Sequence, residues 1–172
     1  MNFEHVPGYG LGELLKDKNN PRGIEIGCLD GDTTFFLLKT KEDIIINSVD
    51  PYMQYTDWHG HHVSFNLNQK QMVIERMKEF GSRFNLINKT SDDACMDFAN
   101  DEYDFMFIDG LHTYEQVLKD CKNYYSKIKS GGIFSGHDYT GIEGVNRAVN
   151  EFAFSVGKTI KETKNHVWYW IK

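Results

Sequence analysis

Short apolar stretches alternate with amphipathic stretches along most of the chain, and this alternation is the strongest constraint on its fold. Strand-like runs are expected at residues 23–27, 43–50, 84–89, 103–109 and 131–136. Apolar residues at helical spacing predict helices at 32–39, 67–80 and 113–129, and one more that carries Val145, Ala148, Val149 and Phe152. A short helix near 10–17 and strands near 158–163 and 167–171 are expected at the two ends.

Continuous apolar strands that alternate with helices are typical of a parallel sheet covered on both faces. The sequence therefore predicts an α/β fold with a doubly wound sheet. In such sheets, ligands bind beyond the carboxyl ends of the strands, where the strand order reverses. Functional residues are accordingly expected directly after each strand.

Length and composition indicate one soluble domain that spans residues 1–172. The chain has 40% hydrophobic and 26% charged residues, and its longest apolar runs, FFLL and III, are too short to cross a bilayer. No signal-peptide pattern opens the sequence, so we expect a cytoplasmic protein without a membrane partner. A net charge of −6 disfavours nucleic acid as the partner, and three cysteines without metal spacing are expected to be reduced and mostly buried.

The turn after the first strand, GIEIGCLDGDTTFF at residues 23–36, limits the choice of ligand. Its spacing is Gly27-x-x-x-Gly31, which is neither the GxGxxG of dinucleotide sites nor a phosphate-binding P-loop. Glu25, Asp30 and Asp32 crowd the turn, and a diphosphate beside them would place like charges together. The turn favours a positively charged ligand, and S-adenosylmethionine carries both a sulfonium and an ammonium group.

Three motifs resemble those of class I S-adenosylmethionine-dependent methyltransferases. EIGCLDG matches the (D/E)xGxxxG motif of that family, and Asp50 ends the second strand about 20 residues later, as in the family. Residues 107–139, FIDGLHTYEQVLKDCKNYYSKIKSGGIFSGHDY, resemble a subfamily with sugar and macrolide O-methyltransferases and cephalosporin-hydroxylase-like proteins. The resemblance implies a Rossmann-like, seven-stranded, mostly parallel sheet with an antiparallel last strand.

The resemblance also implies a set of cofactor-binding residues. Gly27 and Gly31 would line the methionine part of the cofactor, and Glu25 would support the turn or the ammonium group. Asp50 would bind the ribose hydroxyls. Ser91 and Asp92, after the third strand, stand where the family contacts adenine, and Asp109 ends the fourth strand beside the same cofactor.

A hydroxyl acceptor needs a general base or a divalent metal to make it nucleophilic. Asp109 and Asp138 follow the fourth and fifth strands, and with His137 they form a candidate site for Mg²⁺ or, because of the histidine, Mn²⁺. His112 is the candidate general base. The alternative is structural: the aspartates are turn and N-cap residues, and both histidines bond to loops.

Residues 51–65 form the one long irregular connection, and connections of this length are often binding loops. Enclosure of the substrate is expected from this loop, from residues 1–20 or from a neighbouring subunit. The histidines of HGHH at 59–62 lack the partners of a metal site, and Trp168 or Trp170 at a dimer interface is a lesser alternative to a buried strand. The predicted substrate contacts are Tyr52, Tyr55, Trp58, His62, Tyr114 and Tyr139.

These features together predict an S-adenosylmethionine-dependent methyltransferase that acts on a hydroxyl of a small molecule or saccharide with the help of a divalent metal. Two alternatives stay open. One is a cofactor-binding module without catalysis, which needs no Asp109, His112 or Asp138. The other is an NAD-binding oxidoreductase, which the glycine spacing and the acidic turn disfavour.

Overall fold

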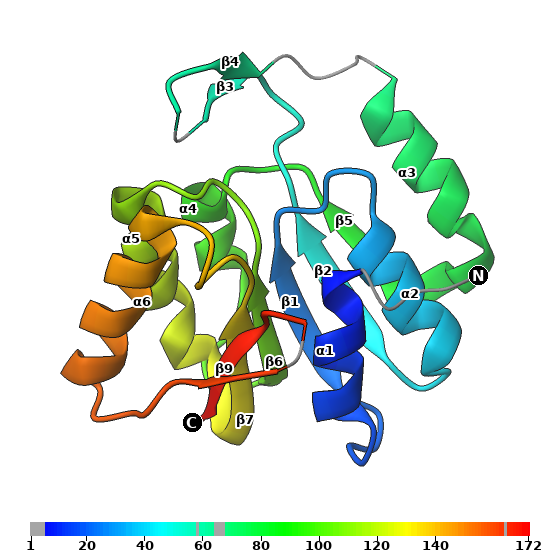
Figure 1. The fold of residues 1–172 in the computed structure, drawn as a ribbon. Helices are drawn as coiled ribbons and strands as arrows, with labels where there is room; N and C mark the ends of the chain where they lie inside the picture. Colours follow the sequence, from blue (N-terminus) through cyan, green and yellow to red (C-terminus); the bar gives the residue numbers. More distant parts are fainter. Residues whose placement is uncertain (1–5, 58, 64–67, 164) are drawn as a thin grey trace.

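A seven-stranded sheet with the order β5–β2–β1–β6–β7–β9–β8 forms the centre of the protein (Figure 1). The computed structural model describes residues 6–57, 59–63, 68–163 and 165–172. The strands are β1 (Arg22–Ile26), β2 (Ile45–Val49), β5 (Phe84–Ile87), β6 (Tyr103–Ile108), β7 (Ile128–Gly136), β8 (Lys161–Glu162) and β9 (Trp168–Ile171). The first five pair in parallel, and β9 runs antiparallel to both of its neighbours. The predicted α/β class and the mostly parallel sheet are confirmed.

Helices cover both faces of this sheet (Figure 1). Helices α1, α2 and α3 lie on one side, and α4, α5 and α6 lie on the other. Their bounds are α1 (Pro7–Leu15), α2 (Asp32–Thr40), α3 (Gln69–Met77), α4 (Ser91–Ala94), α5 (Tyr114–Tyr124) and α6 (Glu143–Ser155). Short 3₁₀ turns follow three of them: η1 (Lys78–Arg83), η2 (Cys95–Asp97) and η3 (Tyr125–Lys127).

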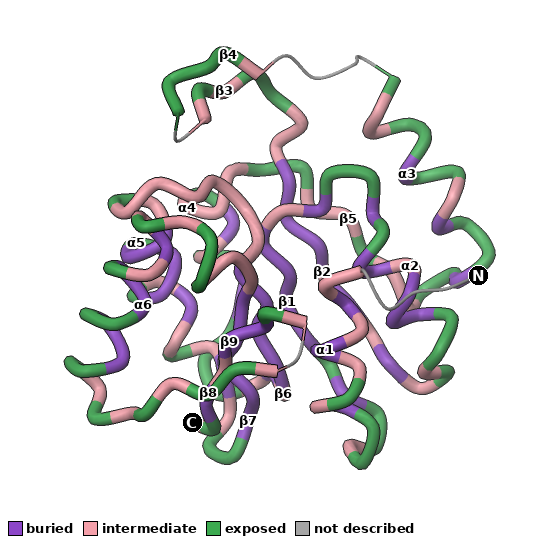
Figure 2. Tube along the Cα trace, in the orientation of Figure 1, coloured by how far each residue is buried: buried purple, intermediate pink, exposed green. Residues whose placement is uncertain are grey.

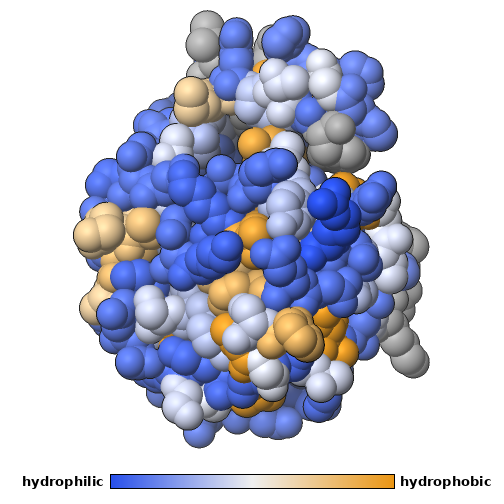
Figure 3. Space-filling view, turned by 90° about the vertical axis from the view of Figure 1, so that its left-hand side faces the viewer, coloured by the Kyte–Doolittle hydropathy of each residue, from blue (hydrophilic) through white to orange (hydrophobic). Residues whose placement is uncertain are grey.

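Two apolar cores result from the period-two alternation of the strands. In β6, Met106 and Ile108 face the core beneath α5 and α6, whereas Phe105 and Phe107 face the core beneath α1, α2 and α3. The strands are therefore buried along most of their length (Figure 2). The outer surface on the side of α5 and α6 is largely hydrophilic, with scattered apolar side chains (Figure 3). Within the described ranges, no helix is both long and apolar enough to cross a membrane.

Three element predictions differ from the structure. The helix predicted at 113–129 ends at Tyr124, passes through a 3₁₀ turn, and gives way to β7 at Ile128. The connection predicted to be irregular contains a two-stranded hairpin, β3 (Tyr55–Thr56) paired with β4 (His62–Val63). The strand predicted at 158–163 is reduced to two residues. Elements of two residues are too short to show a period in the sequence.

The aromatic strand at the end of the chain is buried by the chain itself. Trp168 and Trp170 are 0% and 2% exposed, and both stack against Phe134 or one another. The alternative in which either tryptophan faces a dimer partner is therefore wrong. The cysteines behave as predicted: all three are free thiols, two of them buried.

The carboxyl ends of β5, β2, β1, β6 and β7 reach the same edge of the sheet, because these strands are parallel. The strand order reverses between β1 and β6: the chain moves outward from β1 to β2 and β5, and then returns to the other side of β1. This is the position at which doubly wound sheets bind ligands.

Candidate active site

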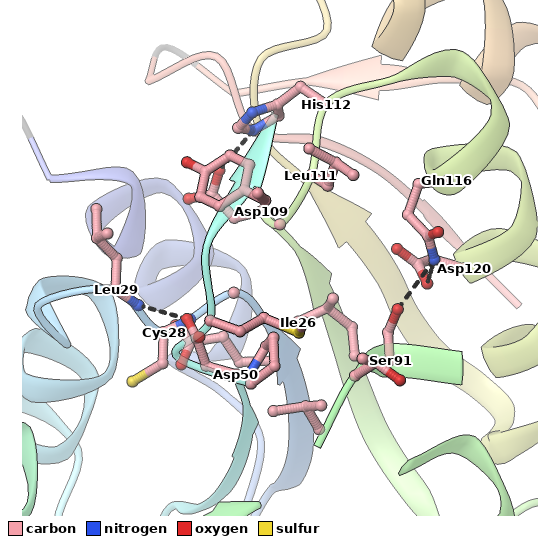
Figure 4. A pocket seen from close by; sticks show the side chains of 18 of the residues that line it. Ile26, Cys28, Leu29, Asp50, Ser91, Asp109, Leu111, His112, Gln116 and Asp120 are labelled. Atoms are coloured by element: carbon pink, nitrogen blue, oxygen red, sulfur yellow. Dashed lines mark hydrogen bonds and ion pairs between the residues drawn. The ribbon is translucent and has the colours of Figure 1, made fainter. Parts of the chain in front are cut away.

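A cavity of about 550 Å³ lies at this edge, over the reversal of strand order (Figure 4). Its walls come from the loop after β1, the loop after β2, the start of α4, the loop after β6 and one side of α5. Pro7, at the start of α1, also lines it. Predicted site residues in the lining are Glu25, Gly27, Asp50, Tyr55, Ser91, Asp92, Asp109 and His112.

Gly27 permits the glycine turn to pack directly on the chain after β6. Its φ is +88°, and a Cβ at this position would lie 2.2 Å from the carbonyl oxygen of Asp109. Gly31 does not belong to the lining. It is the left-handed N-cap residue of α2, and a Cβ there would meet Met77 of α3 rather than a ligand.

The carboxylate of Asp50 holds the turn from the end of β2. Oδ2 accepts hydrogen bonds from the backbone N–H groups of Cys28 and Leu29, each at 3.0 Å, and Oδ1 accepts one from Tyr52 at 2.8 Å. A carboxylate has about four acceptor positions, so one remains for a ligand. The dashed contact between Asp50 and Leu29 is visible in Figure 4.

Glu25 is buried beneath the turn and joins three elements. Its carboxylate accepts hydrogen bonds from Ser48 of β2, at 2.6 Å, and from the Thr34 hydroxyl of α2. Burial raises the pKa of Glu25 to about 7, and the charges of Asp109 and Asp50 add to the increase, while the two hydroxyls oppose it. Glu25 is therefore close to half-protonated at neutral pH, and it supports the turn from below.

Four side chains from the loops after β6 and β7 form a charged cluster at the rim. Nε2 of His112 lies 3.0 Å from Oδ2 of Asp138 and 3.4 Å from Oδ1 of Asp109. Nδ1 of His137 lies 3.2 Å from Oδ1 of Asp138 and 3.9 Å from Oδ1 of Asp109. Asp138 adopts a left-handed φ of +62°, which aspartate tolerates better than most residues.

This cluster contains the predicted metal ligands. One ligand atom each from Asp109, His137 and Asp138 lies within 4.8 Å of the other two. Two carboxylates and an imidazole at this separation are suited to a borderline divalent ion such as Mn²⁺. By contrast, the described histidines of the 59–62 stretch do not take part in any such group.

His112 is cationic at neutral pH in this arrangement. Burial alone would lower the pKa of His112, but its bonds and ion pairs with Asp109 and Asp138 outweigh burial and raise the pKa to about 9. Bonds from His112 and His137 hold the pKa of Asp138 well below its usual range. The protonated imidazole occupies a position between two carboxylates, so it cannot accept a proton as it stands.

A polar group lines the cavity beside α5 (Figure 4). Nε2 of Gln116 donates to Ser91 at 3.1 Å and to Oδ1 of Asp120 at 3.0 Å. Asp92 accepts a hydrogen bond from Lys119 at 2.6 Å and longer ones, at 3.5 Å, from Gln116 and Asn123. Burial raises the pKa of Asp120 to about 6.

The predicted substrate residues are spread more widely. Tyr55 lines the cavity, whereas Tyr52, His62, Tyr114 and Tyr139 do not, and Trp58 lies outside the described residues. The hydroxyls of Tyr114 and Tyr139 donate to Glu151 and Asn150 of α6. His62 bonds to Thr56 across the hairpin.

Gln116 and Asp120 line the cavity, although neither was predicted as a site residue. A signal was present, because Asp120 lies next to Cys121 on the apolar stripe of α5, between Val117 and Tyr124. An acid within such a stripe is buried, and a buried acid requires a hydrogen-bonding partner or a ligand. Leu29 and Met53, which also line the cavity, carried no comparable signal.

Comparison with known proteins identifies the family. A family model described as a methyltransferase domain matches residues 24–139. An uncharacterized protein of Acanthamoeba polyphaga mimivirus is 25% identical over 130 residues, which cover 72% of this chain and 53% of that protein. The chain thus spans about half the length of this curated relative.

Solved structures share the fold at low sequence identity. A Staphylococcus aureus protein described as a caffeoyl-CoA O-methyltransferase aligns with a TM-score of 0.73 and 15% identity over 97% of this chain and 83% of that one. The O-methyltransferase NovP (TM-score 0.71) and a Podospora anserina methyltransferase bound to S-adenosylhomocysteine (0.67) are each 14% identical, covering 96% of this chain and 77% of theirs. The chain belongs to the methyltransferase domain family, and its fold is that of the class I S-adenosylmethionine-dependent methyltransferases.

Proposed function

We propose that the protein transfers a methyl group from S-adenosylmethionine to a hydroxyl of a small molecule or saccharide, with a divalent cation at the rim of the cavity. The observation that carries this proposal is the double position of Asp109. It lines the cavity at the reversal of strand order, and it belongs to the cluster of metal-type ligands with His137 and Asp138. Cofactor and cation would therefore meet at one side chain.

The charge of the cavity supports a cationic cofactor over a dinucleotide. No lysine or arginine occurs among the described lining residues. The imidazolium of His112 is already paired with Asp109 and Asp138, so a diphosphate would face mainly acidic side chains, whereas a sulfonium and an ammonium group would be attracted. The acidic members of the lining are Glu25, Asp30, Asp32, Asp50, Asp92, Asp109 and Asp120.

Each residue has a role in this proposal. Asp50 fixes the turn through Cys28 and Leu29 and offers its remaining acceptor position to the ribose hydroxyls. Gly27 lets the turn pack against the Asp109 backbone and lines the cavity, and the methionine part would lie along this turn. Bound S-adenosylmethionine supplies an electrophilic methyl group, and in-line transfer requires the acceptor oxygen to be held close to it.

Asp109, His137 and Asp138 would hold the cation, and their donor set of two carboxylates and an imidazole fits Mn²⁺ better than Mg²⁺. A divalent cation at this position would lower the pKa of an acceptor hydroxyl. His112 competes for the same two carboxylates and carries a proton at Nε2. We propose that a cation bound to the two carboxylates would displace His112, that the imidazolium would then release its proton to solvent, and that the neutral imidazole would face the acceptor hydroxyl as its base.

The acceptor would enter past residues 51–65, which we propose as the substrate loop of a single methyltransferase domain. The loop carries the β3–β4 hairpin, and Met53, Gln54 and Tyr55 bring it to the cavity wall. The N-terminal segment also contributes Pro7 to the lining. An aromatic side chain such as Tyr55 suits the face of a sugar ring.

A methyl-transfer assay with isotopically labelled S-adenosylmethionine tests the function. The acceptors are a panel of saccharides and small alcohols and phenols, each assayed after chelation with EDTA and again after addition of Mn²⁺ or Mg²⁺. We expect transfer to at least one hydroxyl acceptor and recovery of activity with Mn²⁺. Full activity after exhaustive chelation would contradict the role of the cation in the reaction. Cofactor binding without transfer to any acceptor would favour the non-catalytic module.

A further inference from the structure

Leu29 and Tyr52 adopt a backbone conformation that their side chains disfavour. Six described residues other than glycine have a positive φ, and four of them are asparagine, aspartate or histidine, which adopt it most readily. The other two are Leu29, at +48°, and Tyr52, at +46°. A left-handed leucine or tyrosine costs free energy, so it persists only where surrounding contacts fix it, and such positions are frequent at functional sites.

The two residues lie on different loops and are fixed by the same contacts. Leu29 belongs to the glycine turn after β1, and Tyr52 lies near the start of the loop after β2. The carboxylate of Asp50 accepts from the backbone N–H groups of both, at 3.0 Å and 2.8 Å, and the hydroxyl of Tyr52 donates to the carbonyl oxygen of Leu29 at 3.0 Å. Burial raises the pKa of Tyr52, so this hydroxyl keeps its proton and remains a donor. The two loops therefore hold each other in place.

Tyr52 directs the chain that follows it into the cavity wall. Residues 53–55 line the cavity, although Tyr52 itself does not. Leu29 lines it from the glycine turn, and Leu29 and Met53 are 53% and 54% exposed, so each loop presents a large apolar side chain there. The β3–β4 hairpin, which begins at Tyr55, stands apart from the central sheet (Figure 1). Its position relative to the cavity therefore depends on how its two ends are held.

The far end of the same segment is bonded to the same turn. Nε2 of Gln69, the first residue of α3, donates to Oδ1 of Asp30 at 2.8 Å. Arg76, further along α3, donates to the carbonyl oxygen of Asp30 at 2.8 Å and to the carboxylate of Asp32 at 2.5 Å. Asp30 and Asp32 both line the cavity. The chain is thus bonded to the glycine turn where it leaves, at Tyr52, and where it returns, at Gln69.

We propose that Tyr52 is a positioning residue for the acceptor: through its bond to Leu29, it couples a ligand on the glycine turn to the placement of residues 53–55 in the cavity wall. This inference rests on the proposed function, since it takes the ligand of the turn to be S-adenosylmethionine. A ligand bound to Asp50 fixes the position of Leu29, and Leu29 fixes the hydroxyl of Tyr52. Coupling between two sites is reciprocal, so cofactor and acceptor each increase the affinity of the protein for the other.

Hydrogen exchange measured by mass spectrometry, with and without saturating S-adenosylhomocysteine, tests this coupling without an identified acceptor. In the wild type we expect the ligand to slow exchange at residues 27–31 and at residues 53–57 by at least about fivefold. Tyr52→Phe, which removes only the hydroxyl, should bind the ligand within about threefold of the wild-type affinity and keep the slowed exchange at 27–31, whereas the slowing at 53–57 should fall below about twofold.

Tyr114→Phe is the matched control. It removes a hydroxyl that donates to Glu151, and Tyr114 does not line the cavity, so this variant should behave as the wild type does. The ratio of exchange rates without and with ligand is the decisive quantity. A purely structural role of Tyr52 would speed exchange at 53–57 equally in both states and leave this ratio unchanged, which would contradict the coupling.

The outcomes separate this inference from the function beneath it. A wild type that shows no slowed exchange at 27–31 and no heat of binding overturns both. Slowed exchange at 27–31 without any at 53–57 overturns the coupling and leaves cofactor binding intact. Should Tyr52→Phe fail to fold, the wild type decides: saturating adenosine, which carries only the ribose and the base, should still slow exchange at 53–57. An effect of adenosine confined to 27–31 would contradict the inference.

Discussion

Nε2 of His112 lies 3.0 Å from Oδ2 of Asp138, so an imidazole from the loop after β6 is bonded to a carboxylate from the loop after β7. The contact joins the two loops that flank the proposed cation site. It also means that the metal-free protein contains its own cation there, the protonated His112, between Asp109 and Asp138.

His112→Asn should lower the stability of the metal-free protein in a pH-dependent way. Because the folded-state pKa of His112 is raised from 6.5 to about 9, its stabilising effect is fully present below pH 6.5 and is lost as pH rises through 9. Asp138, whose pKa is lowered, contributes in the range above its ordinary pKa of 3.8. Urea unfolding after chelation should show a loss of roughly 1.5 to 3 kcal/mol at pH 6 and a smaller loss at pH 9.5. A loss that grows above pH 9 would contradict the ion pair.

Glu25→Gln should also become more stable relative to wild type as pH rises, for a different reason. The folded chain binds the Glu25 proton more tightly than the unfolded chain does, since its pKa rises from 4.5 to about 7. Its contribution is present below pH 4.5 and is lost as pH rises through 7. Between pH 5 and pH 8, the free energy of unfolding of the variant should therefore rise by about 1 kcal/mol or more relative to that of the wild type. Glu13→Gln, on the exposed surface of α1, is the control and should show no gain.

Asp109→Asn and Asp138→Asn should separate catalysis from cofactor binding. In both variants turnover should fall by a factor of about a hundred or more. The reason is that they weaken binding of the cation, whose charge activates the acceptor hydroxyl. Affinity for S-adenosylhomocysteine should stay within about tenfold, roughly 1.4 kcal/mol. If both variants lose cofactor binding instead, these residues belong to the cofactor half of the site.

Gly27→Ala should destabilise the fold more than Gly157→Ala does. Both glycines have a positive φ, at +88° and +65°, so both variants carry the cost of a left-handed alanine, about 1 kcal/mol. Only at Gly27 would the new Cβ also meet the Asp109 carbonyl, 2.2 Å away. We expect a loss of at least about 2 kcal/mol at Gly27 by denaturant unfolding. Equal losses in the two variants would mean that the turn can move away from β6.

The sequence was sufficient for the sheet and for the glycine turn. Runs such as DFMFI in β6 are apolar on both faces, which is the pattern of strands covered on both sides. The acids and glycines around Gly27 narrowed the choice of ligand to a positively charged one. Chain order alone also placed Asp109, His137 and Asp138 together, because parallel strands end at one edge.

Other features depend on contacts that no local pattern reveals. The end of α5 at Tyr124 follows from the docking of residues 125–127 against β7, although apolar residues continue at helical spacing. The ion pairs that raise the pKa of His112 join two separate loops, so the sequence alone did not reveal the two carboxylates beside the predicted base. Asp120 was overlooked because its neighbours on α5 are core residues.

The most direct test of the account is a calorimetric titration of the wild type with S-adenosylhomocysteine, with and without Mn²⁺ or Mg²⁺, and with NAD as the comparison ligand. We predict micromolar binding of S-adenosylhomocysteine and no measurable binding of NAD, because the cavity lining offers acids and backbone donors and no lysine or arginine among its described residues. Binding of NAD, or binding of neither compound, would contradict the assignment of the glycine turn and the roles given to Asp50 and Asp109.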